Sequence, residues 1–510
     1  MNIDKRSYHV FSEQGQNMLF DRSTGTVAEV SEDLYDLLGA IKDAPDTVVD
    51  VEGLLQEEGV EPESILPGLK DFTDKGFFQF IPVDHGEQEA ILQSLLAHIP
   101  KRMQLLMAQS CNLGCRYCYA WRNGSNQLKT LMSVETARAA VDYLIKRSAD
   151  RPEIEITFFG GEPMLNWGVI QQTVSYALER CQATGKSVSF EMITNGTLLT
   201  PEAVHYLAAH RFMLMVSIDG WEEMHNYNRP ALVPNTEHAQ IVANAQYANS
   251  HYKSQGLRPI KIRANMTHRF HDYVKIGDYL RSLGFERVAV ASIEHLPHGD
   301  PSPAAVTEDD TDELMARGYQ RLTHLVDNID NLANFTGTEK EELSPLLDDQ
   351  FATSLKGVIC GIGRNTQTID CEGNIYPCHR YEGMKAYILG NIYQGLDREK
   401  TLQYYRKVNG NATSRCHSCW IRDYCAGGCA WLLSSKSGEL VDPTPRECDR
   451  RRLGFQRALY LRSKLRRKRP QLFAQSLIPV PTFSARETGD AKSAKTPTGV
   501  CSCGTGGCGS

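Results

Sequence analysis

The cysteines of this chain offer its most distinctive chemistry, beginning with a group of three. Cys111, Cys115 and Cys118 lie in the segment CNLGCRYC, so a single loop presents three thiols. Three thiolates suit an iron–sulfur cube in which one iron is left open for an outside ligand. A tetrahedral zinc site needs a fourth ligand close by, and the neighbouring sequence has none. A zinc knuckle, or spacing by chance, is therefore the weaker interpretation.

A second group of cysteines lies between residues 351 and 450. The chain has 15 cysteines in 510 residues, and in a protein that is not secreted so many thiols are more typical of metal ligands than of disulfides. This segment has weak hydrophobic periodicity and looks rich in loops, so we expect bound metal to order it. Its cysteines are Cys360, Cys371, Cys378, Cys416, Cys419, Cys425, Cys429 and Cys448.

The end of the chain carries a third group. Residues 470–510 are rich in Ser, Thr, Gly, Lys and Pro, which predicts a flexible tail, and Cys501, Cys503 and Cys508 lie in its glycine-rich end. A tail with reactive thiols, an extra metal or cluster-loading site, and a substrate-like segment are three open interpretations. Because the other two groups already supply enough ligands, truncation after about Gln471 is predicted to leave the iron content unchanged.

Residues 100–330 alternate strand-like and helical runs. Runs such as FMLMVSI fit strands that are buried on both faces, and helical runs such as Ser133–Ser148 and Glu202–His210 imply parallel pairing through right-handed crossovers. The predicted fold class is therefore α/β, with an open or partial (β/α)6 barrel whose chemistry collects at the C-terminal ends of the strands. The predicted strands are Met103–Ala108, Glu153–Phe159, Val188–Thr194, Phe212–Ile218, Ile260–Met266 and Arg287–Ile293.

Residues 1–85 predict a small β-hairpin with helices. Ser31 can cap a helix that continues to about Lys42, and a second helical run covers Val48–Glu57. From the residues alone, a structural appendage and a peptide-docking module are equally good interpretations. The strand-like runs are Tyr8–Phe11, Met18–Asp21 and Thr26–Val30.

Composition and charge exclude several classes of protein. An apolar content of 41% is too high for a disordered chain, and the apolar runs are too short to span a membrane. The N-terminus lacks the features of a secretory signal, so a cytoplasmic location is expected. A net charge of −7 argues against general nucleic-acid binding. The ten Lys and Arg of residues 450–469 predict a helix with a solvated basic face, although docking of an acidic peptide or, more remotely, of RNA are alternatives.

The three-cysteine motif after the first predicted strand resembles that of radical S-adenosylmethionine (AdoMet) enzymes. The GGEP run at residues 160–163 resembles the GGE motif of this family, and the SIDG run at residues 217–220, with His225 downstream, resembles a subfamily signature. The resemblance implies a 4Fe–4S cluster on Cys111, Cys115 and Cys118. The AdoMet contacts that it implies are Tyr117, Gly160, Gly161, Glu162, Ser217, Arg229 and Asn265.

The second cysteine group resembles the SPASM domain, which binds two auxiliary 4Fe–4S clusters in this family. The fourth ligand of the inner cluster stays open. Cys371 is the available substitute, and without it an open iron could bind a substrate thiolate. The resemblance assigns Cys416, Cys419, Cys425 and Cys448 to the outer cluster, and Cys360, Cys378 and Cys429 to the inner one.

The residue after Cys378 indicates which group within this family the chain resembles. Sulfatase-maturing relatives have a catalytic Asp at the position of His379, which argues against formylglycine formation here. The YPCH run instead resembles maturases of the ranthipeptide (SCIFF) type, which form thioethers in cysteine-rich peptides. It implies a catalytic role for His379, with a supporting position beside a cluster as the alternative. Residues 1–85 resemble the winged-helix-like recognition domain of such maturases, which would bind a leader peptide as an extra strand.

The resemblance as a whole implies a radical SAM/SPASM maturase with three 4Fe–4S clusters and AdoMet. A 5′-deoxyadenosyl radical would abstract hydrogen from a precursor peptide or protein, and a Cys thioether would close. Carbon–carbon crosslinking, formylglycine formation and an inactive iron–sulfur scaffold are alternatives. A flavodoxin or ferredoxin is the expected reductant, and no membrane or nucleic acid is expected as a partner. The predicted parts are 1–85, 100–330, 351–450, 451–469 (the basic helix) and 470–510.

Overall fold

The structure is a computed structural model of the whole chain. The residues that it describes all lie in one compact unit, Met1–Gln475. Cys360 and the three tail cysteines, with the predictions made for them, lie outside the described residues. The described residues are 1–57, 62–79, 100–122, 124, 128–234, 236–293, 304–347, 366–408, 416, 419–425, 428–435, 437–439 and 441–473.

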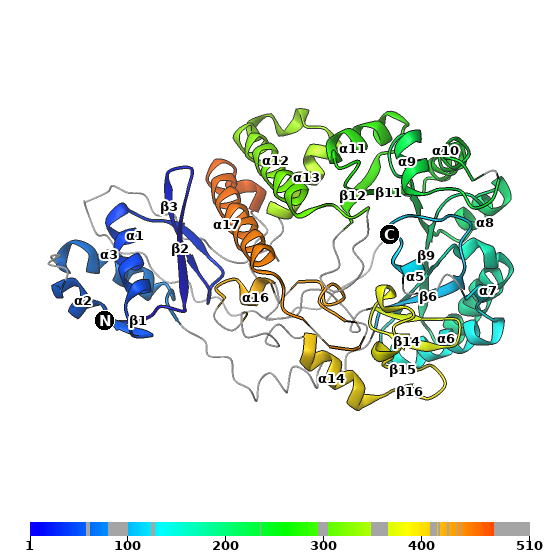
Figure 1. Cartoon of the computed structure of the whole chain (residues 1–510), viewed down its shortest axis with the longest axis horizontal. Coiled ribbons are helices and arrows are strands. Elements are labelled where there is room, and N and C mark those ends of the chain that lie inside the picture. The colour runs from blue at the N-terminus through cyan, green and yellow to red at the C-terminus, as the bar shows by residue number, and fades with distance from the viewer. Residues whose placement is uncertain are drawn as a thin grey trace, which may run out of the picture. The chain divides into compact units, whose positions relative to one another are not determined.

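Six parallel strands that follow one another in chain order make up one side of the largest sheet, beginning at its edge (Figure 1). All six predicted strands are confirmed, and their ends differ from the prediction by at most one residue. Their long apolar runs explain this accuracy, because side chains such as Phe158 and Val216 are fully buried. The strands are β6 (Arg102–Gln109), β8 (Glu153–Gly160), β9 (Ser187–Thr194), β10 (Met213–Ser217), β11 (Lys261–Met266) and β12 (Arg287–Ser292).

Helices connect these strands, and side-chain caps define where several of them begin. The hydroxyl of Ser133 accepts the N–H of Thr136, and that of Thr200 accepts the N–H of Ala203, as the N-cap preference predicts. The helices are α5 (Tyr119–Arg122), α6 (Val134–Arg147), η2 (Pro163–Asn166), α7 (Trp167–Ala183), α8 (Pro201–Ala209), α9 (Glu222–Asn228), α10 (His238–Ser254) and α11 (Tyr273–Ser282).

The cysteine-rich segment extends this sheet, which the expectation of a loop-rich segment missed. Strand β13 (Thr366–Ile369) pairs in parallel with β6, and β14 (Asn374–Tyr376) continues the sheet on its other side. Strands of two to four residues are too short to show a hydrophobic period. The remaining elements here are β7 (Thr130–Leu131, on β6), β15 (Gly390–Asn391), β16 (Gly395–Leu396), η5 (His379–Tyr381), η6 (Lys385–Tyr387), α14 (Arg398–Val408) and α16 (Arg422–Cys425).

The N-terminal part confirms the three strand-like runs and the helix capped by Ser31, whose hydroxyl accepts the N–H of Leu34. The prediction of one helix over Val48–Glu57 is wrong at its start, because Val48–Asp50 pairs with the first strand instead. Pairing with a distant strand overrides local helical pattern here. The elements are β1 (Asn2–Asp4), β2 (Tyr8–Glu13), β3 (Gln16–Asp21), β4 (Val27–Glu29), α1 (Glu32–Asp43), β5 (Val48–Asp50), α2 (Val51–Glu57) and α3 (Pro62–Asp74).

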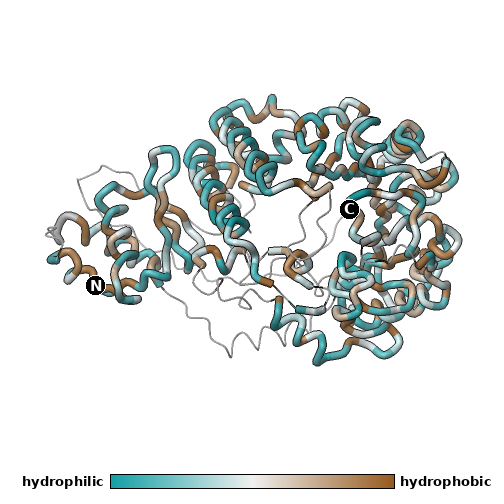
Figure 2. Tube along the Cα trace, viewed as in Figure 1, coloured by the Kyte–Doolittle hydropathy of each residue, from teal (hydrophilic) through white to brown (hydrophobic). Residues whose placement is uncertain are grey.

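The basic C-terminal helix, α17 (Pro445–Lys468), begins six residues before the predicted start and so includes Cys448. It is mainly hydrophilic (Figure 2), yet its basic face is not simply solvated. Arg446 and Arg450 pair with Asp312, and Lys464 pairs with Asp327, both on α12 (Glu308–Asp327). The other helices here are η3 (Ile329–Asn334), α13 (Gly337–Leu347) and η7 (Pro470–Phe473). No helix in the described part of the chain is both long and apolar enough to cross a membrane.

Candidate functional site

A cavity of about 420 Å³ lies where the parallel strands of the large sheet end. Most of the predicted site residues line it, because the carboxyl ends of parallel strands meet at one edge of a sheet. Three side chains from the cysteine-rich segment, His379, Arg380 and Trp431, line the same cavity. The lining includes Cys111, Cys115, Tyr117, Cys118, Gly160, Gly161, Thr194, Asn195, Ser217, Arg229, Arg263, Asn265 and Trp431.

The three thiols of the first cysteine group face this cavity from the loop after β6. Burial raises the pKa of Cys111 to about 12 and also raises those of Cys115 and Cys118. The guanidinium of Arg229 opposes this at Cys115, with Nη1 3.9 Å from Sγ. Among the described residues, no three His, Cys, Asp or Glu side chains converge closely enough to hold a single metal ion. A cluster attaches each thiolate to a different iron, so it does not require such convergence.

The GGEP turn after β8 shapes another wall. Gly160 has φ +125°, and a Cβ there would lie 2.6 Å from the carbonyl oxygen of Ala108, so only glycine fits. Glu162 is fully buried and is not among the lining residues. Its carboxylate accepts the N–H of Asn195 at 2.7 Å and the hydroxyl of Thr194 at 2.7 Å. The glycine backbone therefore faces the cavity, while the Glu162 side chain joins the ends of β8 and β9.

Glu162 is held in an unusual electrostatic state. Burial raises its pKa to about 7, although the hydrogen bonds from Asn195, Thr194 and Met164 lower it. Each of these donors favours the ionised form, whereas the loss of water favours the neutral form. A carboxyl group with this pKa gains or loses its proton near neutrality.

Asp219 organises the opposite wall, and the sequence reasoning gave it no role. It is completely buried and accepts the hydroxyl of Tyr117 at 2.6 Å and the N–H of Asn265 at 2.9 Å. It also pairs with Arg229, whose Nε lies 3.0 Å from its Oδ2. A single carboxylate thus fixes three of the predicted AdoMet contacts. Its position in the SIDG run at the end of β10 was the available signal.

The structure shows the contacts of His225 and Tyr117, which the motifs around these two residues did not predict. Nδ1 of His225 accepts the backbone N–H of Asp219 at 3.2 Å, so this buried ring holds the backbone of Asp219 and is not among the lining residues. The ring of Tyr117 lies 5.4 Å from the guanidinium carbon of Arg229. Its face is therefore partly occupied by a cation.

His379 enters the cavity from the cysteine-rich segment. Its Nδ1 lies 3.1 Å from Oε1 of Gln104 on β6, and its ring meets Phe159 edge to face at 4.9 Å. Burial, with Arg380 beside it, lowers the pKa of His379 to about 3, so the ring is neutral at physiological pH. An amide oxygen only accepts, so Nδ1 carries the hydrogen and Nε2 has a free lone pair. Gln104 was not anticipated from the sequence.

The second cysteine group divides in space. Arg380 connects two of the predicted inner ligands, because Cys378 Sγ accepts its N–H at 3.4 Å and Cys429 Sγ lies 3.9 Å from its Nη1. Burial raises the pKa of Cys448, three nearby thiols raise it further, and Arg452 lowers it. The predicted outer ligands therefore lie near one another. Those thiols are Cys416, Cys419 and Cys425.

Cys371 lies apart from both of these sets. It is buried in the core of the large sheet, where its thiol donates to the carbonyl oxygen of Leu106 at 3.3 Å. Burial raises its pKa to about 12. A ligand role for Cys371 would require the thiol to leave this hydrogen bond.

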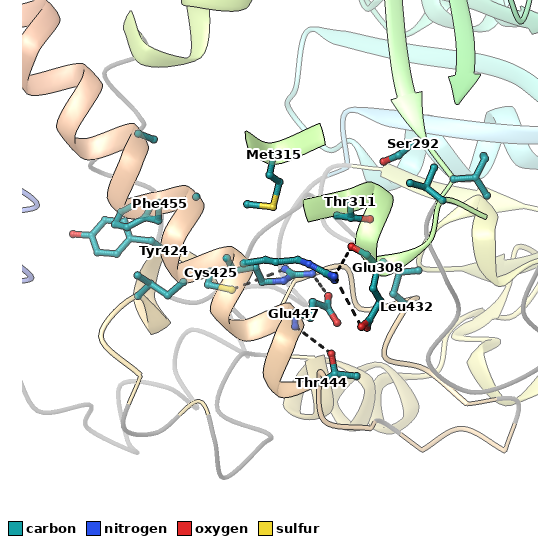
Figure 3. Close-up of a pocket in the computed structure, with 17 residues that line it drawn as sticks. Ser292, Glu308, Thr311, Met315, Tyr424, Cys425, Leu432, Thr444, Glu447 and Phe455 are labelled. Carbon is teal, nitrogen blue, oxygen red and sulfur yellow. Dashed lines mark hydrogen bonds and ion pairs between the residues drawn. The ribbon is translucent and has the colours of Figure 1, made fainter. Parts of the chain in front are cut away.

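A second cavity, of about 700 Å³, lies between α12, α16 and α17 (Figure 3). Ser292 and Ile293, at the end of β12, line both cavities. Cys425 borders the second cavity, and Arg451 lies beside it with Nη1 4.0 Å from its Sγ. The loop with the first three cysteines and the loop with Cys425 therefore face neighbouring cavities.

Comparison with known proteins defines the class of the site. Residues 105–300 match the Radical SAM superfamily, so this part of the chain is a radical SAM domain. Such a domain implies a 4Fe–4S cluster and AdoMet. The residues present fit these groups, because three thiols line a cavity of small-molecule size that Gly160 and Gly161 line with backbone alone.

Longer relatives extend the similarity beyond this domain. The radical SAM cyclopropyl synthase TigE of Paramaledivibacter caminithermalis is 20% identical over 477 residues, which cover 86% of this chain and 92% of TigE. A cysteine-type anaerobic sulfatase-maturating enzyme of Clostridium perfringens (strain 13 / Type A) is 22% identical over 348 residues, covering 64% of this chain and 88% of the enzyme. The predicted resemblance to radical SAM peptide maturases is confirmed.

A solved structure supports the fold. The structure described as native anSMEcpe with bound AdoMet and Kp18Cys peptide aligns with a TM-score of 0.57 and 18% identity, covering 72% of this chain and 99% of that one. At this identity the likeness concerns the fold alone. The predicted α/β class, with its large parallel sheet, is confirmed.

Proposed function

We propose that this protein is a radical SAM maturase that forms Cys thioether crosslinks in a ribosomally made precursor peptide. One observation carries the proposal. The three thiols after β6 and three side chains of the cysteine-rich segment, His379, Arg380 and Trp431, line one cavity. A site for radical formation and a site for sulfur chemistry would then act on one bound residue.

Cys111, Cys115 and Cys118 would hold the radical cluster, and AdoMet would bind against the Gly160–Gly161 backbone. When bound, these groups would supply a carbon-centred radical that abstracts hydrogen from the peptide. The chain's own part is positioning. Asp219 fixes Arg229, Tyr117 and the backbone of Asn265 in one arrangement, so that these groups can hold AdoMet without rearranging.

The cysteine-rich segment would hold two auxiliary clusters. Cys416, Cys419, Cys425 and Cys448 would hold the outer one, and Cys360, Cys378 and Cys429 the inner one. Arg380 donates toward two of the inner sulfurs, and hydrogen bonds to ligand sulfurs tune the potential of a cluster. An inner iron without a fourth protein ligand would bind the thiolate of a substrate cysteine.

His379 would orient the substrate in this cavity. With Nδ1 held by Gln104, its neutral ring presents a lone pair at Nε2 and can accept a hydrogen bond from a substrate thiol or amide. The neighbouring cavity, which shares Ser292 and Ile293, provides a route along which the peptide could reach this position.

The first experiment needs no substrate. The anaerobically reconstituted protein, reduced with dithionite, is expected to release 5′-deoxyadenosine from AdoMet, and flavodoxin or ferredoxin should replace dithionite. Release should be lost when Cys118 is replaced by Ala. A wild-type protein that binds its full complement of iron and releases no 5′-deoxyadenosine would overturn the radical assignment.

The second experiment identifies the bond. A cysteine-containing peptide encoded beside the gene is incubated with the enzyme, and its mass and free thiols are measured. A thioether removes two hydrogens, retains sulfur and makes one thiol unreactive toward iodoacetamide. Carbon–carbon crosslinking removes two hydrogens but leaves every thiol reactive.

Formylglycine formation is the second candidate, because sulfatase-maturating enzymes are among the relatives. It would remove sulfur from a cysteine substrate, which the same mass measurement detects. The position of His379 argues against it, since the resemblance places an acidic residue there in those enzymes.

A further inference from the structure

The N-terminal sheet β2–β3–β4 has two buried faces. Side chains alternate between the faces of a strand, and the register pairs His9 with Phe20 and Phe11 with Met18. These four side chains share one face. The opposite face, with Tyr8 and Leu19, packs against the helices of the N-terminal part. An antiparallel sheet that stood alone would have a polar second face, so the face with Phe11 and Phe20 is built to be covered.

Aromatic side chains from the far end of the chain cover this face. The ring of His9 stacks on Trp420 with centroids 3.9 Å apart and planes 11° apart. Phe20 meets Trp420, Tyr424 and Phe455 at centroid distances of 5.9, 5.4 and 5.6 Å. The hydroxyl of Tyr424 also donates to the backbone oxygen of Arg22 at 3.3 Å. Burial lowers the pKa of His9 to about 3, so a neutral ring makes this stack.

The covering residues are the neighbours of predicted cluster ligands. Trp420 directly follows Cys419, and Tyr424 directly precedes Cys425. Phe455 lies on α17, seven residues, or about two turns, after Cys448. Figure 3 shows Phe455 and Tyr424 together on the side of the second cavity where Cys425 lies. The loop and α17 thus both contact the N-terminal sheet through aromatic rings, which directly neighbour Cys419 and Cys425 in the loop and lie about two turns from Cys448 on α17.

The described part of the loop between Cys416 and Cys429 has little regular secondary structure to support it. Between Cys416 and Cys429, the longest element in the described part is α16, which has four residues. A helix of that length is not stable by itself. The order that the backbone does not supply must come from side-chain packing and from metal.

We propose that the N-terminal sheet is a structural part of the outer cysteine site, and that its aromatic face holds the loop in the conformation that retains iron there. The proposal rests on the proposed function in one respect, namely that Cys416, Cys419, Cys425 and Cys448 bind a cluster. Linkage makes the coupling reciprocal, so iron in the site stabilises the docked sheet. Since the sheet lies within residues 1–85, which resemble a peptide-recognition domain, precursor binding would be coupled to the outer cluster.

The test is the rate at which the reconstituted holoenzyme loses iron to an excess of a ferrous chelator. His9→Ala removes the stack on Trp420 and should release roughly four irons about two- to tenfold faster than wild type, the range that corresponds to one aromatic pair. Val10→Ala is the matched control, because it truncates the next residue of β2 on the face toward the other core. His9→Phe restores a ring and should restore slow release.

The outcomes separate this proposal from the one on which it rests. Faster release in His9→Ala alone, with rescue by His9→Phe, supports it. Equal release in His9→Ala and Val10→Ala, whether slow or fast, overturns it. Cys425→Ala is the reference for the site. If that variant keeps all of its iron, the outer cluster assignment is wrong and the inference fails with it. If it loses roughly four irons while His9→Ala behaves like wild type, only the inference fails.

A reciprocal measurement uses hydrogen exchange. Removal of iron from the holoenzyme should lower the protection of β2 and β3, while β9 in the large sheet keeps its protection. Unchanged exchange in β2 and β3 after complete iron removal contradicts the coupling.

Discussion

The first and the outer cysteine sites differ in how their thiols are assembled. Cys111, Cys115 and Cys118 lie within eight residues, on a loop that leaves the end of β6. The outer site draws Cys416, Cys419 and Cys425 from one short loop and Cys448 from α17. The first loop is attached to a sheet with a large core of its own. The outer loop is attached to a helix and to the N-terminal sheet through a few rings.

Because of this difference, loss of a thiol should affect catalysis at the first site and folding at the outer site. A thiol lost from the first site leaves the sheet intact, because buried apolar residues of six parallel strands hold it. A thiol lost from the outer site removes part of what orders its surroundings. The same substitution, Cys to Ala, should therefore have different consequences at the two sites.

The largest expected effect is at the first site. Cys115→Ala should abolish AdoMet cleavage while the protein retains roughly eight irons, which correspond to two remaining cubes. Release of 5′-deoxyadenosine and iron analysis measure the two quantities. Cys181→Ala, at a buried cysteine of α7 that belongs to neither site, should keep both. Loss of all iron in Cys115→Ala would contradict the independence of the sites.

At the outer site the same change should affect the fold. Cys425→Ala is expected to lose roughly four irons and to become poorly soluble, because metal binding and local folding are one process there. Its thermal unfolding should begin well below that of Cys115→Ala in the same buffer. A soluble, fully active Cys425→Ala protein would refute the assignment of this site.

The large sheet could be predicted from sequence because its strands carry their own signals. Phe212–Val216 is a continuous apolar run, and Ser133 and Thr200 mark the starts of helices. The short strand β13 has no such signal, since its pairing with β6 and β14 defines it. The helix prediction was wrong for the first three residues of Val48–Glu57 for the same reason, because a distant partner decides their conformation.

The residues of the candidate site likewise include some that the sequence could identify and some that it could not. Cys111 could be named from the spacing of the cysteines, and Gly160 from the resemblance of its GGEP run to a family motif. Asp219 and Gln104 could not be given roles, because what matters is the hydrogen bonds that they make across the sheet. The contact of His9 with Trp420 joins residues 411 positions apart, and no local pattern in either segment indicates it.

A smaller effect is expected from the glycine wall of the first site. In Gly160→Ala the new Cβ would lie 2.6 Å from a backbone oxygen at φ +125°, so the turn must shift. We expect a loss of about 1–3 kcal/mol in stability and a weaker binding of AdoMet, measured by thermal unfolding and by equilibrium dialysis. Gly168→Ala, where nothing lies within 4 Å of the new Cβ in helix α7, should lower neither quantity.

The smallest expected effect is the pH dependence of stability at the docked N-terminal sheet. Burial lowers the pKa of His9 to about 3, with Lys42 of α1 and Arg452 of α17 contributing. The unfolded ring takes up a proton below about pH 6.5, whereas the folded ring does not. The stability that His9 contributes is therefore complete above pH 6.5 and is lost as the pH falls toward 3.

We therefore expect the wild-type holoenzyme to lose thermal stability between pH 7.5 and pH 5.5 more steeply than His9→Phe. The difference at about pH 5.5 should be at most about 1.4 kcal/mol, the value of one pKa unit. His205→Phe, at an exposed histidine on α8, is the control and should follow the wild type. A His9→Phe protein with the same pH profile as the wild type would mean that the His9 ring does not stay buried against Trp420 as the pH falls.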